Sequence, residues 1–175
     1  MTLGKQMIEQ LRLLAAGEAA LAQLPTDGER FTLAISGQPN QAALEFLDHD
    51  RYSVTLRALD VSRGAPVVGD ARTYLSAAAA AIARQLSYLE EPLAVWELDS
   101  VEQLAQLRSS PPQRDGEEIS YWEVTLWASE QRGARIMRYR WAPGMTEREA
   151  LAYPATFALV GRLVDSLAMA IQEEV

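Results

Sequence analysis

The stretch YWEVTLWASEQRGARIMRYRW, residues 121–141, decides the fold of this chain. Apolar and polar side chains alternate on both sides of a polar segment, and this period of two is typical of a β-hairpin. Pairing apolar with apolar and acid with base favours one register. That register leaves 130–133 as the turn, with Gly133 free to adopt the left-handed conformation. It predicts the pairs Trp122–Trp141, Val124–Tyr139 and Leu126–Met137 on one face, and Glu123–Arg140 and Thr125–Arg138 on the other.

The outer face of this hairpin is the first candidate site. In the favoured register Trp127 lies across from Ile136, and Thr125, Arg138 and Arg140 flank them. Tryptophan and arginine are enriched at the centres of protein interfaces, so we expect this face to bind a partner protein or a second copy of the chain. The alternative is that a helix or loop of the same chain covers it.

The chain before the hairpin begins with a helical pattern and continues with strands. Apolar residues follow helical spacing over 4–24, and Pro25 ends that helix. Alternation then predicts strands around 31–35, 44–46 and 52–58, with a turn at 48–51. Residues 41–47 also suit a short helix, and the sequence leaves that alternative open.

A second helix is expected after Asp70, whose carboxylate is a good N-cap. Residues 93–98 then suggest a short strand, 99–107 a turn of helix, and 109–118 a loop that contains two adjacent prolines.

The region after the hairpin predicts a long final helix. Thr146 and Glu149 form a capping box that starts a helical segment, and Pro154 kinks or restarts it. The helix carries two apolar stripes. Because two stripes usually cover two surfaces, Leu159 and Leu163 on the second stripe are added to the interface candidates.

These elements together predict an α+β fold. We expect a mostly antiparallel sheet of five to six strands with an N-terminal, a middle and a long C-terminal helix, in the order α-βββ-α-β-ββ-α, within a single domain over 1–175. A weak repeat, YSVTL at 52–56 and YWEVTL at 121–126, suggests two pseudo-repeated halves at about 28–90 and 92–175.

The amino-acid composition limits which catalytic, metal and disulfide sites the chain can form. The 175 residues include no cysteine and one histidine, and they carry a formal charge of −8. The chain therefore has no thiol catalysis, thiolate metal site or disulfide. No phosphate-binding glycine motif is present, so we expect no cofactor, no metal and no enzymatic activity. The N-terminal residues do not resemble a signal peptide, and no stretch suits a membrane span, which favours a cytoplasmic protein without membrane contact.

The element order resembles the YbjN and type III secretion chaperone-like families. The segments FTLAIS, LEFLD and YSVTLRAL, the hairpin at 121–141 and PATFALVGRLVDSLAMAI carry the resemblance. It implies a homodimer that binds partner proteins and has no catalytic residues. The function expected is thus a chaperone- or adaptor-like protein-binding module.

Two other functions remain possible at this point. An accessory nucleic-acid-binding protein would stack bases on Trp127 beside Arg132, Arg135, Arg138 and Arg140, against the repulsion of an acidic chain. A small-molecule enzyme or sensor would require a pocket that the sequence does not reveal.

Overall fold

The computed structural model describes residues 1–172 and contains three α-helices, two 3-10 helices and ten strands in that range. The elements are α1 (Leu3–Ala15), η1 (Leu21–Gln23), β1 (Phe31–Gly37), β2 (Asn40–His49), β3 (Ser53–Arg63), α2 (Ala71–Gln85), η2 (Ser87–Leu89), β4 (Leu93–Asp99), β5 (Leu104–Ser109), β6 (Gln113–Asp115), β7 (Glu118–Ala128), β8 (Arg132–Trp141), β9 (Glu149–Leu151), β10 (Tyr153–Thr156) and α3 (Phe157–Ile171).

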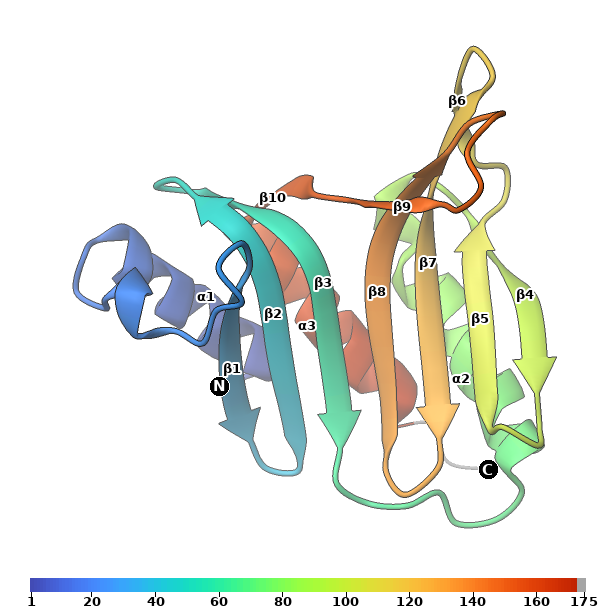
Figure 1. The fold of residues 1–175 in the computed structure, drawn as a ribbon. Coiled ribbons are helices and arrows are strands. Elements are labelled where there is room, and N and C mark those ends of the chain that lie inside the picture. The colour runs from blue at the N-terminus through green and yellow to red at the C-terminus, as the bar shows by residue number, and fades with distance from the viewer. Residues whose placement is uncertain (173–175) are drawn as a thin grey trace.

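The predicted α+β class is confirmed. All strands join one sheet with the main order β1-β2-β3-β8-β7-β5-β4, and every pair that the structure describes is antiparallel. The sheet has ten strands where the sequence suggested five or six, because three of the added strands are only three or four residues long and β5 was not expected. The helices lie behind the sheet in Figure 1, so its other face, called here the open face, carries no helix.

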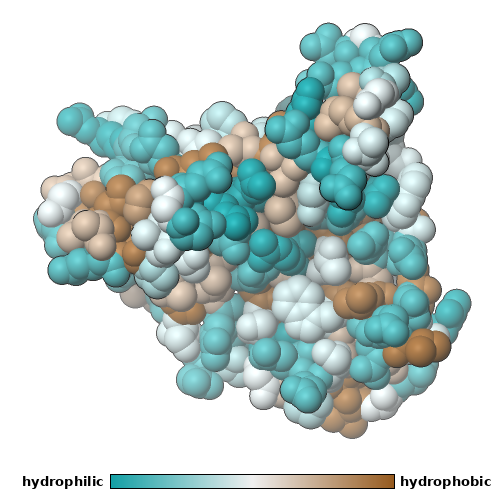
Figure 2. Space-filling model, viewed as in Figure 1, coloured by the Kyte–Doolittle hydropathy of each residue, from teal (hydrophilic) through white to brown (hydrophobic). Residues whose placement is uncertain are grey.

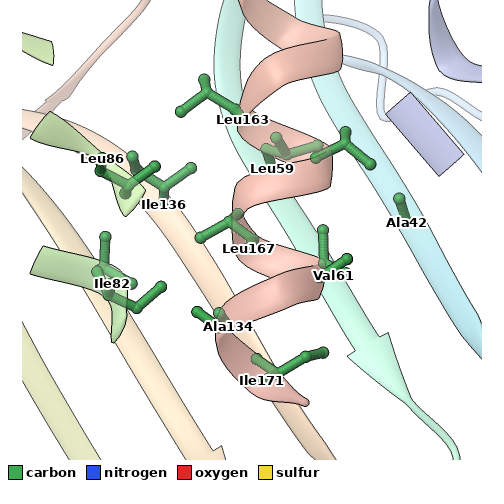
Figure 3. Packing of buried hydrophobic residues seen from close by; sticks show 14 of the residues in the cluster. Ala42, Leu59, Val61, Ile82, Leu86, Ala134, Ile136, Leu163, Leu167 and Ile171 are labelled. Carbon is green, nitrogen blue, oxygen red and sulfur yellow. The ribbon is translucent and has the colours of Figure 1, made fainter. Parts of the chain in front are cut away.

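The two later helices cover different parts of the sheet. α2 follows β3 but covers β4, β5 and β7, whereas α3 covers β3 and β8 and also packs against α1 and α2. Figure 3 shows Leu163, Leu167 and Ile171 on α3, which crosses β3 and β8 beside Ile82 of α2. All three are fully buried. The proposed pseudo-repeat remains a prediction, and its last three residues lie outside the described range.

The centre of the sheet forks. β3 pairs with β8 only over Leu59–Arg63, and beyond that stretch the two strands separate. β9 then pairs with β8 and β10 with β3, so the segment 149–156 fills the fork (Figure 1). The helix predicted from the Thr146–Glu149 capping box is therefore wrong: backbone groups here pair with strands, and Pro154 lies in β10. The helix starts at Phe157, with Thr156 as its N-cap.

Helix boundaries follow local capping. The Asp70 carboxylate accepts the Thr73 N–H, which confirms the predicted N-cap of α2. α1 ends at Ala15, well before the predicted Leu24, because Gly17 adopts a positive φ of 75° and the chain turns there. The region 41–47 is strand, as its alternation indicated.

Two glycines allow α1 and α3 to cross closely. A methyl group built on Gly4 would lie 2.2 Å from the carbonyl oxygen of Gly161, and one on Gly161 would lie 2.4 Å from Ile8. The Gly4 N–H also donates to the Asp165 carboxylate at 2.8 Å, which fixes the start of α1 on α3.

The segment 99–118 is more strand-rich than expected. β5 occupies Leu104–Ser109, so the predicted helical turn at 99–107 is wrong. Its alternate residues Ala105 and Leu107 are buried under α2, which is the two-residue periodicity of a strand. The expected loop at 109–118 contains β6, which forms a short hairpin with β7.

Candidate protein-interaction site

The hairpin β7–β8 exists, but its predicted register is wrong. Val124 lies opposite Ile136 rather than Tyr139, a displacement of three residues. An odd displacement exchanges the two faces of one strand relative to the other. Gly133 is consequently a strand residue opposite Trp127, and a methyl group at Gly133 would lie 2.1 Å from the indole ring. The glycine serves to seat the tryptophan, not to form a left-handed turn.

The displaced register moves two interface candidates into the core. Ile136 is fully buried beneath the helices, and Leu163 of α3 is fully buried with it (Figure 3). Neither side chain can contact a partner while the chain is folded. Leu159 is half-buried and packs against the same core.

Arg138 also lies on the helix-covered face. Its side chain is only 5 % exposed and forms an ion pair with Glu91 at 3.0 Å. It donates to the Ser120 hydroxyl at 3.1 Å, and its guanidinium lies over the Trp122 ring at 5.1 Å. These contacts stabilise the buried Arg138 cation at a position where the sequence predicted an exposed interface residue.

The remaining hairpin candidates do not gather into one patch. Arg140 forms ion pairs with Glu118 and Glu149 at the far end of β8. Thr125 and Trp127 are half-buried on the open face, with Trp127 packed over Gly133. The predicted surface is therefore not assembled as expected.

The arginines grouped in the nucleic-acid hypothesis are divided between the two faces. Arg132 lies under α3, where it donates to the Ile171 carbonyl and stacks on Tyr74. Arg135 is on the open face and is paired with Asp60 at 2.7 Å and with Glu45. Carboxylates or carbonyls hold these guanidinium groups, so the geometry offers no continuous basic track for phosphates.

An arginine and carboxylate network instead covers the centre of the open face. Glu123 is 4 % exposed and accepts hydrogen bonds from Arg108 at 2.8 Å and from both terminal nitrogens of Arg148. Arg148 also stacks on the Tyr139 ring at 3.7 Å. This hydrogen bonding raises the pKa of Arg148 well above its usual value. The network folds the segment between β8 and β9 over the sheet.

Burial and ion pairing oppose each other at Asp60. Desolvation raises the pKa of its carboxyl group despite the nearby Arg135 guanidinium, and one carboxylate oxygen has no hydrogen-bond partner in the described chain. The neighbouring hollow of about 380 Å³ has a floor of small side chains from β1, β2 and β3. It is open to solvent, and its polar lining consists of Ser36, Gln41, Asp60 and Ser62.

A different surface emerges at the edge strand β4. Within residues 1–172, β4 pairs only with β5. Four apolar side chains are exposed on β4, in the β4–β5 turn and at the start of β5, and we call them the apolar edge cluster: Val95 (53 % exposed), Trp96 (65 %), Val101 (86 %) and Leu104 (37 %). Figure 2 shows hydrophobic residues beside hydrophilic ones on this side of the open face. A free edge with exposed apolar residues is a ready site for pairing with another strand.

Local structure explains why Trp96 is exposed. A β-bulge lies between Val95 and Glu97, and the extra residue turns the indole onto Arg108, whose guanidinium lies 4.9 Å from the ring centroid. Arg108 is fixed in turn by Glu123. The tryptophan is thus held in place although most of its surface is free. Sequence analysis identified the strand 93–98 but missed this residue, because without β5 beside it the strand had no defined edge.

Neither a metal-ligand cluster nor a membrane-spanning helix is found among the described residues. No group of three histidine, aspartate or glutamate side chains within 1–172 is placed to hold a metal ion. The only histidine of the chain, His49, lies at the β2–β3 turn beside the Asp50 carbonyl. No helix in this range is long and apolar enough to cross a bilayer.

No family model, curated protein or solved structure matches this chain. The resemblance to YbjN and secretion chaperone-like proteins stays a prediction.

Proposed function

We propose that this chain is a non-enzymatic protein-binding module, chaperone- or adaptor-like, that acts in the cytoplasm as a homodimer. The observation that carries the proposal is the apolar edge cluster: β4 pairs on one side only within residues 1–172, and valine, leucine and tryptophan are exposed on it and on the adjoining turn and strand. A partner segment added to this edge would gain backbone hydrogen bonds and bury apolar surface at once.

The exposure of consecutive apolar residues at a sheet edge favours a binding role for this edge. Trp96 and Val95 are consecutive exposed residues on the edge of a ten-stranded sheet. Monomeric proteins usually protect such edges with charges, prolines or β-bulges, because an exposed edge promotes association. β4 carries a bulge and Glu97, yet Val95 and Trp96 stay exposed beside them. The exposed edge therefore favours an interaction role. The proposed homodimer rests on the family resemblance alone, and sedimentation velocity of the purified chain tests it separately.

The test compares two exposed aromatic residues. The tagged wild-type chain, Trp96→Ala and the control Tyr52→Ala are used for affinity capture after nuclease treatment, and co-purifying proteins are quantified. Tyr52 is 70 % exposed in the β2–β3 turn, away from β4, so both variants are expected to keep the fold. We expect one or more proteins to bind the wild type and Tyr52→Ala and to be lost with Trp96→Ala. Equal recovery by all three chains would contradict the proposed site.

A further inference from the structure

Three carboxylates beside the apolar edge cluster stand apart from the other acids of the sheet. Glu97, Asp99 and Glu102 line a hollow of about 250 Å³ whose remaining walls are Leu104, Ala105 and Gln106. Within residues 1–172 none of the three has a cation at salt-bridge distance. The Asp99 carboxylate accepts the N–H groups of Val101 and Glu102 and so shapes the turn, and the structure assigns Glu97 and Glu102 no such bond.

Elsewhere on the sheet most carboxylates are paired with arginine; among the described strand residues Asp48 and Asp115 are exceptions. Glu123 is paired with Arg108 and Arg148, and Asp60 with Arg135. Glu45, Glu118 and Glu149 are likewise paired. The contrast is informative because the chain has fifteen arginines and places them beside most other acids of this sheet, yet none beside the β4–β5 turn. The carboxylates at this turn are therefore available to pair with a cationic group from outside the chain.

We propose that the free edge of β4 binds an extended segment of a partner protein in which arginine or lysine alternates with apolar residues. This inference rests on the proposed function and names the partner chemistry of the same site. Along an added strand, alternate side chains point to the same face, spaced by two residues. Basic side chains on the open face would reach Glu97, the hollow and the face of Trp96, which already lies against Arg108, while the backbone pairs with β4 and apolar side chains on the other face contact Val95.

Charge selects this occupant over two others. A second β4 would bring another Glu97 and Asp99 against the same carboxylates, and like charges brought together across strands are destabilising. A nucleic-acid strand would bring phosphates to an acidic edge of an acidic chain. A basic segment is attracted by both the local carboxylates and the net charge of −8.

The experiment uses three labelled nine-residue peptides in which valine alternates with arginine, glutamine or glutamate. Fluorescence anisotropy measures their binding to the full chain at low salt. We expect the arginine peptide to bind most tightly and its affinity to fall with added salt. The double variant Glu97→Gln/Glu102→Gln should weaken its binding about tenfold, since two exposed ion pairs are lost. Both positions are exposed, so the fold should persist.

A matched control removes the same charge elsewhere. Glu117 and Glu147 are exposed and lie in loops away from the β4–β5 turn. Glu117→Gln/Glu147→Gln therefore reduces the net negative charge of the chain by the same amount as Glu97→Gln/Glu102→Gln. We expect it to leave arginine-peptide binding within about twofold of wild type, as distant exposed charges are screened. An equal loss in both double variants would show that net charge, not this site, attracts the peptide, and would overturn the inference.

The outcomes also separate this inference from the proposed function. If all three peptides bind equally and Trp96→Ala abolishes binding of each, the edge binds protein segments but the charge argument is wrong. If no peptide binds, the inference is overturned, while the capture experiment with Trp96→Ala still decides the proposed function. If Trp96→Ala converts a dimer into a monomer, a second copy occupies the edge and the inference is again overturned.

Discussion

Replacing Gly4 with alanine tests the close crossing of α1 and α3. Helix propensity alone predicts a gain of up to about 1 kcal/mol for this change. The structure predicts the opposite, because the new methyl group would lie 2.2 Å from the Gly161 carbonyl oxygen and 2.6 Å from the Asp165 carboxylate. An unstrained carbon to oxygen contact is about 3.3 Å. The helices must therefore separate by roughly 1 Å, or the hydrogen bond from Gly4 to Asp165 must break.

The expected cost follows from that displacement. Overpacking of this kind costs about 1–3 kcal/mol, and the propensity gain offsets part of it, so the free energy of unfolding should fall by about 1–2 kcal/mol. For a domain of this size the midpoint of thermal unfolding would drop by about 2–8 °C. Differential scanning calorimetry and urea unfolding measure both quantities.

The control is Gly64→Ala in the segment between β3 and α2. A methyl group there meets no atom within 4 Å, and Gly64 has no positive φ. Its stability should stay the same or rise by up to about 1 kcal/mol, since alanine restricts the unfolded chain. If Gly4→Ala is as stable as Gly64→Ala, the helices do not cross as closely as described and the reasoning is refuted.

Two further predictions concern charge. Glu123→Gln removes the buried carboxylate shared by Arg108 and Arg148 and should lower the free energy of unfolding by about 1–3 kcal/mol, less than for a fully buried pair because both arginines can turn toward water. Glu149→Gln, at an exposed pair, should change the free energy of unfolding by less than about 0.5 kcal/mol in the same urea titrations. Equal effects of the two variants would contradict this distinction. Backbone N–H groups of its own turn lower the pKa of Asp27 from 3.8 to about 2, so its contribution to stability should be complete above the ordinary value and lost as the pH falls toward 2. An NMR titration that finds Asp27 at its ordinary pKa would disprove this.

The sequence predicted elements better than it predicted pairing. The hairpin at 121–141, the N-cap at Asp70 and the strands before it follow from periodicity and capping, which are local properties. The hairpin register does not. Trp122 pairs with Arg138, a combination that the rule of apolar with apolar rejected. The Arg138 guanidinium is instead paired with Glu91 and stacked on Trp122, and Glu91 comes from a segment far away in the sequence.

The candidate site depended on this non-local information. Whether a residue of β8 faces the helices or the open face is decided by α2 and α3, which need the small Ala134 and the apolar Ile136 beneath them (Figure 3). The Thr146–Glu149 box is a valid local signal, but the fork between β3 and β8 needs those residues as strands. Trp96 could be recognised as a surface residue only after β5 was placed beside β4 and the other side of β4 was left free.

During synthesis β3 leaves the ribosome long before β8, its partner on the side away from β2, and α3, the helix that covers it. Its partner strand β8 begins at Arg132, and the helix that covers it begins at Phe157. The first three strands can pair with one another early, but the apolar face of β3 remains exposed to solvent until nearly all of the described chain has emerged. Because such distant contacts must form last, folding should be slow and should be completed only after α3 has emerged. A chain truncated after Trp141, which lacks α3, is therefore expected to aggregate, and a soluble, cooperatively unfolding fragment would contradict this order of events.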